Sequence, residues 1–154
     1  MSKVAHTQRI AMTEHAGRQI ASMVRLEQSI ELDPTIRELV KLRASQINGC
    51  AYCLDMHWKD ARAAGETEER LYMLDAWRES PLYSDRERAA LELCESVTLI
   101  SETHVPDDVW EQAAAEFEPD ELAQLVVQIA AINLWNRLSI TARTTPGTYQ
   151  PQAH

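Results

Sequence analysis

DPTIRELVKLRASQINGCAYCLDMH, residues 33–57, predicts two consecutive helices. Asp33 and Pro34 have the chemistry of an N-cap followed by a first-turn proline. From there apolar side chains recur with a period near 3.6 residues until Gly49, which is typical of a helix end. A second helix should therefore begin at Cys50, antiparallel to the first.

The rest of the chain favours helix as well. The sequence holds four glycines and one Phe, whereas Ala, Leu, Glu and Arg recur throughout, so most positions favour helix over strand. We predict an all-α fold. The first three expected helices cover residues 14–30, 34–48 and 50–64. A short helix should follow Thr67, and another should begin at the capping box of Ser84 and Glu87. The last two are a shorter helix from Pro106 and one from Pro119 to Leu138.

The length of 154 residues suits one domain and is too short for two with a linker. We expect a single domain over residues 1–154, with a core of about 14–143. The tail, residues 144–154, has no hydrophobic period and is expected to be extended or mobile. The helix after Pro119 is apolar on most of its circumference, so it should be central or packed against another subunit.

The charge of the chain restricts its partners. A formal net charge of −9 argues against nucleic-acid binding and favours small molecules or proteins. The first seven residues contain no apolar run behind Lys3, so we expect no secretory signal and a cytoplasmic location. The most apolar stretch, residues 122–135, is shorter than the roughly 20 residues that span a bilayer, so no membrane segment is expected.

Two of the three cysteines have C-x-x-C spacing, which in a cytoplasmic chain suggests redox or metal chemistry. On a helix, Cys50, Cys53 and His57 follow one stripe, because they are three and then four residues apart. A helix N-terminus lowers the pKa of a thiol from about 8.5 into the range of roughly 3.5–7.5. The stretch thus places two acidified thiols next to a base.

The helix terminus alone favours Cys50 as the more acidic thiol. His57, however, lies one turn beyond Cys53, where it could accept the proton of that thiol and later return one to a leaving group. Cys53 is therefore the better-supported nucleophile. The sulfenic acid that forms on it would condense with Cys50 to a disulfide, which a dithiol reductant would reopen.

Glu38 is a candidate partner for His57. The two residues lie about 16 and 12 Å from the turn between the two helices, so they could meet across the hairpin. A carboxylate there would orient the imidazole and raise its basicity. The sequence does not determine which way each helix face points.

The spacing of Glu38, Cys50, Cys53 and His57 resembles the core motif of the alkylhydroperoxidase D (AhpD) and carboxymuconolactone decarboxylase superfamily. The resemblance extends over roughly residues 30–143. It implies an all-α fold built on a helical hairpin, assembly as trimers or hexamers, and reduction by dihydrolipoyl-type or other dithiols. It also implies that Cys53 attacks peroxide, that Cys50 resolves, and that His57 and Glu38 relay protons. The one redox group it implies is the Cys50–Cys53 disulfide, with no bound cofactor and no metal.

One position departs from the founding peroxidases of this family, which carry a histidine just before the second cysteine. This chain has Tyr52 there, and tyrosine has little basicity at neutral pH because its pKa is near 10. A lower peroxidase rate or another oxidant is therefore an open alternative. The decarboxylase branch lacks the cysteine pair, so a lyase fits this chain poorly.

The sequence leaves two alternatives to the peroxidase open. One is a general thiol–disulfide oxidoreductase or redox-responsive protein, and the other is a helical module that binds zinc through Cys50, Cys53 and His57. No second C-x-x-C motif supports the zinc reading. A c-type haem would need a histidine where Leu54 stands. Cys94 lies on an apolar helix face and is expected to be a buried, inert thiol.

Aromatic and amide side chains elsewhere are expected to serve structure rather than chemistry. We expect Trp58, Trp77 and Trp135 to be core or interface residues. Asn133 and Asn136 are expected to satisfy buried hydrogen bonds. The exposed surface should include His15 and His104.

Overall fold

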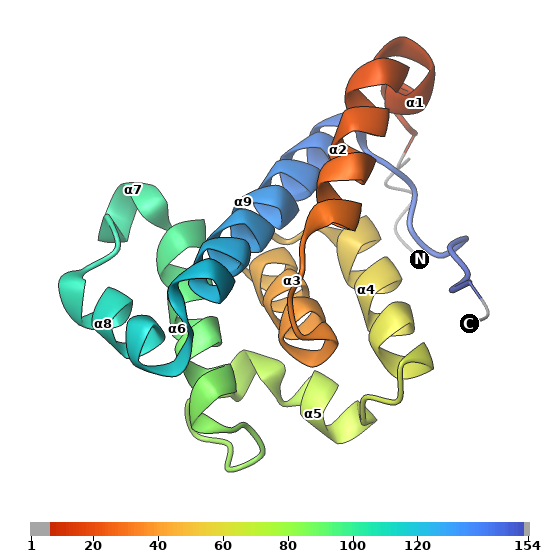
Figure 1. Cartoon of the computed structure of the whole chain (residues 1–154). Coiled ribbons are helices and arrows are strands. Elements are labelled where there is room, and N and C mark those ends of the chain that lie inside the picture. The colour runs from red at the N-terminus through yellow and green to blue at the C-terminus, as the bar shows by residue number, and fades with distance from the viewer. Residues whose placement is uncertain (1–6, 153–154) are drawn as a thin grey trace.

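The computed structural model describes residues 7–152, and every regular element in that range is helical (Figure 1). Residues 1–6, part of the segment on which the expectation of no secretory signal rests, and the tail residues 153–154 lie outside the described part. The elements are α1 (Met12–His15), α2 (Gly17–Ser29), α3 (Pro34–Asn48), α4 (Ala51–Ala63), α5 (Glu68–Tyr72), the 3₁₀ helix η1 (Leu74–Ala76), α6 (Asp85–Thr98), α7 (Ile100–Thr103), α8 (Asp107–Glu116) and α9 (Pro119–Ala142). The predicted all-α class is confirmed.

Helix α3 lies at the centre of the molecule, with α4 on one side and α6 on the other (Figure 1). One face of α3, carrying Val40 and Ala44, packs into a cluster formed mainly with α6, α8 and α9. Another face, carrying Leu39 and Leu42, packs against α5, η1 and the loop that follows. Because α3 buries two faces, its position is fixed from both sides.

The ends of the helices follow the capping chemistry of the sequence. The side chain of Asp33 accepts a hydrogen bond from the backbone N–H of Ile36 at 3.0 Å, with Pro34 in the first turn of α3. Gly49 ends α3 in the left-handed conformation, with φ of 69°, which glycine adopts without a steric penalty. Ser84 and Glu87 form the predicted capping box of α6. These contacts confirm the predicted starts of α3 and α6 and the predicted end of α3, and α4 follows Gly49 and packs back against α3.

Helix α9 crosses the bundle diagonally and packs against both α3 and α6 (Figure 1). Asn136 donates to Ser45 Oγ at 3.0 Å, and Asn48 donates to the side chains of Asn133 and Asn136 at 2.9 Å. The expectation that Asn133 and Asn136 satisfy buried hydrogen bonds is confirmed. These bonds hold the C-terminal end of α3, where the cysteine segment begins, against α9.

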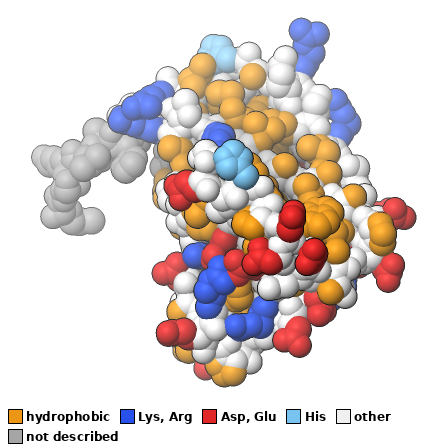
Figure 2. All heavy atoms as spheres, turned by 90° about the vertical axis from the view of Figure 1, so that its left-hand side faces the viewer, with side chains coloured by type: hydrophobic (Ala, Val, Ile, Leu, Met, Phe, Trp, Pro, Cys, Tyr) orange, Lys and Arg blue, Asp and Glu red, His pale blue; other side chains and the backbone are white. Residues whose placement is uncertain are grey.

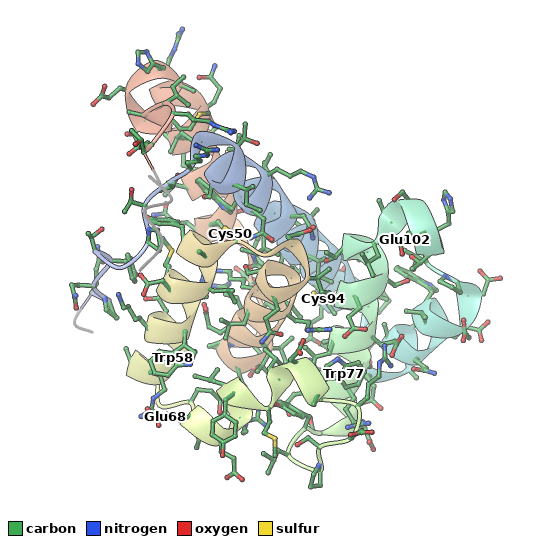
Figure 3. All side chains as sticks on the ribbon, turned by 180° about the vertical axis from the view of Figure 1, so that it is seen from behind. Cys50, Trp58, Glu68, Trp77, Cys94 and Glu102 are labelled. Carbon is green, nitrogen blue, oxygen red and sulfur yellow. A yellow bond between two sulfur atoms is a disulfide. The ribbon has the colours of Figure 1, made fainter. Side chains whose placement is uncertain are left out.

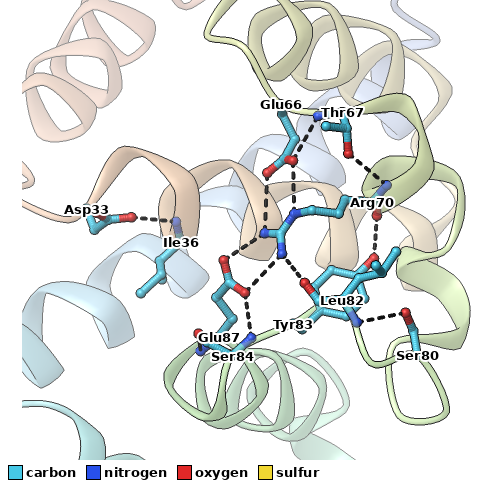
Figure 4. Close-up of polar contacts among 10 residues, drawn as sticks. All are labelled: Asp33, Ile36, Glu66, Thr67, Arg70, Ser80, Leu82, Tyr83, Ser84 and Glu87. Atoms are coloured by element: carbon cyan, nitrogen blue, oxygen red, sulfur yellow. Dashed lines mark hydrogen bonds and ion pairs between the residues drawn. The ribbon is translucent and has the colours of Figure 1, made fainter.

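The far end of the hairpin is held by a network around Arg70 on α5 (Figure 4). The guanidinium bonds Glu66 at 2.9 Å and Glu87 at 2.7 Å, and it also donates to the carbonyl of Leu82. The phenol of Tyr83 donates to the carbonyl of Arg70. Charge-assisted bonds of this kind join the loop after α4 to the start of α6.

The segment after α9 runs back along α4 in an extended conformation (Figure 1). The backbone N–H of Gly147 donates to Asp55 Oδ2 at 2.9 Å, and Lys59 Nζ donates to the carbonyl of Tyr149 at 3.0 Å. The phenol of Tyr149 donates to Asp60 Oδ1 at 2.7 Å. Residues 144–152 form no helix, and the expectation of an extended or mobile tail stays a prediction. No feature of the sequence predicted that the tail would lie against α4, the helix that carries Cys53.

The face formed by α7 and α8 exposes hydrophobic side chains beside acidic ones (Figure 2). Ile100 and Trp110 are among the large apolar side chains that stand open to solvent. On α9, Val127, Leu134 and Ile140 are exposed as well. Within residues 7–152, no helix is both long and apolar enough to cross a membrane.

Candidate active site

The cysteine pair lies at the junction of the two hairpin helices. Cys50 is the N-cap of α4, and its backbone N–H donates to the carbonyl of Ser45 at 3.0 Å. Figure 3 shows Cys50 at this junction, well away from Cys94. Cys50 and Cys53 form a disulfide, with Cα atoms 5.4 Å apart. The structure is therefore the oxidised form of the pair.

His57 and Glu38 meet across the hairpin, as the spacing predicts. Nδ1 of His57 lies 3.2 Å from Oε2 of Glu38, and both side chains are largely buried. The two atoms are not aligned as a full hydrogen bond, and neither has a hydrogen-bond partner among residues 7–152. Since Nδ1 faces the carboxylate, Nε2 is the nitrogen left for proton exchange. The four predicted residues are thus brought together, while their catalytic roles stay predictions.

Two positively charged side chains, Lys41 and Arg37, lie near Glu38 in addition to His57. Lys41 Nζ lies 3.7 Å from Glu38 Oε1 and 3.2 Å from an oxygen of Glu27 on α2. Burial by itself raises the pKa of Glu38, but His57, Lys41 and Arg37 together outweigh it and hold this pKa below the ordinary value. Glu38 is therefore an anion at neutral pH and can stabilise a positively charged imidazole.

A pocket of about 540 Å³ opens onto this site between α2, α3, α4 and α9. Cys53 and His57 line it, whereas Cys50 does not. Tyr52 also lies on its wall, and the apolar part of the wall includes Met56 and Trp135. Trp135 thus serves both the pocket and the neighbouring hydrophobic core. A small molecule in the pocket would reach Cys53 and His57 together.

Two residues of the site were missed by the sequence reasoning. Asp60 lies three residues after His57 on α4, and Tyr149 reaches it from the C-terminal segment. Burial first, and then the bond to Asp60, raises the pKa of Tyr149 to about 12. The i, i+3 spacing of His57 and Asp60 was the signal that could have found Asp60. Nothing in the sequence points to Tyr149.

The donor atoms allow a test of metal binding. Glu38, His57 and Asp60 each offer a ligand atom, and these atoms lie within 4.8 Å of one another. Lys41 and Arg37 place two positive charges beside Glu38, which disfavours a cation there. The zinc ligands considered from the sequence, Cys50, Cys53 and His57, are altered too, because the two cysteine sulfurs are joined in a disulfide.

Cys94 lies in the middle of α6 and is fully buried. Its thiol donates to the carbonyl of Val40 at 3.3 Å, and burial raises its pKa to about 12. Such a thiol is almost wholly protonated at neutral pH. The expectation of a buried, inert Cys94 agrees with this geometry.

The structure also tests the predicted locations of two tryptophans and two histidines. Trp77 is buried and donates to Glu95 at 2.7 Å, as expected for a core residue. Trp58 is 40% exposed, so it is not a core residue of the chain by itself. His15 and His104 are exposed, as predicted.

Sequence comparison finds relatives in several bacteria. The carboxymuconolactone decarboxylase family model matches residues 20–96. The uncharacterized protein YdfG of Bacillus subtilis is 44% identical over 87% of this chain and 93% of its own length. The uncharacterized protein YnjA of Escherichia coli is 38% identical over 70% of this chain and 59% of its own length.

Solved structures share the fold. The protein ATU0492 of Agrobacterium tumefaciens, described as a putative antioxidant defence protein AhpD, is 39% identical over 93% of this chain and all of that chain, with a TM-score of 0.89. A peroxidase-related protein of Ralstonia eutropha has a TM-score of 0.77 at 18% identity, covering 89% of this chain and 75% of that one. The debrominase Bmp8 has a TM-score of 0.74 at 15% identity, covering 89% and 74%. At these last two identities the likeness concerns the fold alone. The chain belongs to the carboxymuconolactone decarboxylase family, with an AhpD-like fold.

Proposed function

We propose that the protein is a thiol-dependent hydroperoxide reductase that cycles Cys50 and Cys53 between dithiol and disulfide. One observation carries the proposal: the pocket of about 540 Å³ opens onto Cys53 and His57 and not onto Cys50. This arrangement separates an attacking thiol, which a small oxidant can reach, from a resolving thiol behind it. The sequence predicts the same roles, with Cys53 as the attacking thiol and Cys50 as the resolving thiol.

In the first step the Cys53 thiolate attacks the terminal, hydroxyl-bearing oxygen of the peroxide, ROOH. The S–O bond forms as the O–O bond breaks, so that Cys53 becomes a sulfenic acid and ROH leaves. His57 takes the proton of the Cys53 thiol and gives one to the departing oxygen. Glu38, 3.2 Å from Nδ1, stabilises the imidazolium that exists between these two transfers.

In the second step the Cys50 thiol attacks the sulfenic sulfur of Cys53. The disulfide forms and water leaves, which gives the bonded pair seen in the structure. An external dithiol then reduces the pair: its two thiols become a disulfide and the two cysteines regain their protons. We propose a dihydrolipoyl protein or a similar dithiol as this reductant.

The assembly and the location are also proposals. The exposed apolar side chains of α9 and of the α7–α8 face support a homo-oligomer, with a trimer or hexamer as the proposed form. We propose the cytoplasm as its compartment, since dithiol reductants keep cysteine pairs reducible there.

Tyr52 supports a second candidate function. It lies on the pocket wall where the founding peroxidases carry a histidine, so the site has one base fewer. A thiol–disulfide oxidoreductase with little peroxidase turnover would have the same disulfide. Both candidates predict a disulfide after one equivalent of peroxide, and only steady-state turnover separates them.

The decisive assay measures peroxide consumption with a dithiol reductant, over hydrogen peroxide and organic hydroperoxides. We expect sustained turnover, its loss in Cys53→Ser, and its retention in Cys94→Ser, which removes a thiol outside the site. Full activity in Cys53→Ser would contradict the mechanism. Oxidation to the disulfide without sustained turnover would favour the oxidoreductase.

A further inference from the structure

Asp60 lies beside the His57–Glu38 pair but has no role in the steps above. Cys53, His57 and Asp60 occupy positions i, i+4 and i+7 of α4 and therefore share one face of the helix. One carboxylate oxygen of Asp60, one of Glu38 and one ring nitrogen of His57 lie within 4.8 Å of one another. The imidazole thus lies between the thiol, one turn before it, and a second carboxylate, one turn after it.

The C-terminal segment fixes the conformation of Asp60. Tyr149 donates its phenolic hydrogen to Asp60 Oδ1 at 2.7 Å, and the other carboxylate oxygen accepts no hydrogen bond from the described residues 7–152. The segment itself is anchored to α4 through Gly147 to Asp55 and through Lys59 to the carbonyl of Tyr149. These anchors lie on the same helix as Cys53 and His57, so the phenol is held in a fixed position relative to the site.

We propose that Asp60, held by Tyr149, is a positioning residue that acts with Glu38 on His57 to stabilise the imidazolium paired with the Cys53 thiolate. The inference rests on the function proposed above and adds residues from the C-terminal segment to its machinery. A positive imidazole is favoured by two carboxylates more than by one. Asp60 is two turns from Cys53, so its charge acts on the imidazole more strongly than on the thiolate.

The other charges around His57 do not replace Asp60. From α3, Arg37 and Lys41 bring positive charge that opposes the imidazolium, and Lys41 is engaged by Glu27 of α2. The pocket side chains that α9 contributes, Trp135, Leu138 and Ser139, are uncharged. Near the positive charges of Arg37 and Lys41, a second anion counterbalances their effect on the imidazole.

The test measures the reactivity of Cys53 in the reduced full-length Cys50→Ser protein, by iodoacetamide alkylation across a range of pH. Cys94 is buried and does not compete. In Asp60→Asn we expect the midpoint of the pH profile to rise by about one pH unit, which slows alkylation roughly tenfold near neutral pH. Tyr149→Phe should shift it in the same direction by about half as much, and Asp60→Glu should restore most of the effect.

Matched controls remove the same groups elsewhere. Asp108→Asn removes an exposed carboxylate of α8, and Tyr72→Phe removes the hydroxyl of an exposed tyrosine on α5. Both should leave the profile unchanged. An unmoved midpoint in Asp60→Asn would overturn the proposal, and so would an equal shift in the two controls. Circular dichroism checks folding, and Tyr149→Phe keeps the test available if Asp60→Asn fails to fold.

A second readout tests the contact itself. The pKa of Tyr149, raised to about 12 by burial and by Asp60, should fall towards 10 in Asp60→Asn. Ultraviolet absorbance of tyrosinate measures this, with Tyr149→Phe identifying the signal. An unchanged titration in Asp60→Asn would contradict the contact. Neither the alkylation profile nor the tyrosine titration needs peroxide. Absence of peroxide turnover would therefore reject the proposed function, and these two measurements would still decide the role of Asp60.

Discussion

Cys53 and Cys94 are both almost inaccessible, with exposed fractions of 3% and 0%, yet their surroundings differ in every respect that governs thiol chemistry. Cys53 lies in the first turn of α4, beside a pocket and one turn from His57. Cys94 lies within α6, where its thiol donates to the carbonyl of Val40 and burial raises its pKa to about 12. Burial alone therefore does not decide the reactivity of a thiol, which depends also on a helix terminus, a neighbouring base and access for a ligand.

The largest expected effect is the difference in reactivity between the two thiols themselves. In the reduced native protein, iodoacetamide should modify Cys53 at least about 10³-fold faster than Cys94, because a pKa near 12 leaves so little thiolate on the latter. Peptide mass spectrometry after timed quenching gives both rates. Cys94 should react freely once the protein is unfolded in urea. Comparable alkylation rates of Cys53 and Cys94 in the native protein would show that their surroundings do not set their reactivity.

The next effect concerns the base. His57→Ala should lower the rate of the first oxidation of Cys53 by peroxide about 10²-fold, because the thiol loses its proton acceptor and the leaving oxygen its donor. Stopped-flow measurement under single-turnover conditions isolates this step. His104→Ala, at an exposed position after α7, is the control and should react as the parent protein does. A similar loss of rate in His57→Ala and His104→Ala would show that His57 is not the base for Cys53.

A smaller effect is expected at the carboxylate. Glu38→Gln keeps the shape of the side chain but removes the charge 3.2 Å from His57, and should slow the same step by about tenfold. Glu38→Asp, which keeps the carboxylate, should restore part of the rate, whereas raising the pH of the Glu38→Gln variant should not. This pair of results would assign the effect to the carboxylate of Glu38. A rate equal to that of the parent protein would exclude Glu38 from the relay.

Glu38 also makes a prediction about stability against acid. Its pKa is lower in the folded protein than the ordinary value of 4.5, so it stabilises the fold above about that pH and loses this contribution as pH falls through the folded pKa. Urea unfolding from neutral to acidic pH should therefore show a steeper loss of stability in the parent protein than in Glu38→Gln. Parallel curves would contradict the direction of this shift.

The smallest effect on turnover is expected at the Arg70 network. Arg70→Met leaves Glu66 and Glu87 without their shared partner, which should cost about 2 kcal/mol of unfolding free energy. The network is built on α5, whose first residue Glu68 lies at the opposite end of α4 from Cys50 (Figure 3), so peroxide turnover of the folded variant should not change. Urea denaturation and the turnover assay together check both parts. Loss of turnover without loss of stability would show that this end of the hairpin affects the site.

Much of the fold follows from local sequence signals. The caps at Asp33 and Ser84 and the glycine at position 49 fix helix ends through contacts within a few residues, and such ends can be predicted without tertiary structure. The spacing of Cys50, Cys53 and His57 likewise defines one helical stripe. The meeting of Glu38 with His57 needed one further assumption, the rotation of two helices, which spacing alone does not give.

Contacts between distant segments were beyond the sequence reasoning. Tyr149 lies 89 residues from Asp60 in the chain, and its segment has no periodicity to suggest what it would touch. Its anchors, Gly147 to Asp55 and Lys59 to a carbonyl, use backbone groups that every residue carries. Such contacts depend on the path of the chain after α9, so only the tertiary structure reveals them.

The central claim, that Cys53 attacks and Cys50 resolves, is tested most directly by mass spectrometry after one equivalent of hydrogen peroxide, with dimedone present to trap sulfenic acid. We predict that Cys50→Ser carries a dimedone adduct on Cys53, that Cys53→Ser carries none on Cys50, and that the parent protein forms the disulfide instead. An adduct on Cys50 in Cys53→Ser, formed as fast as the one on Cys53 in the other variant, would contradict the account.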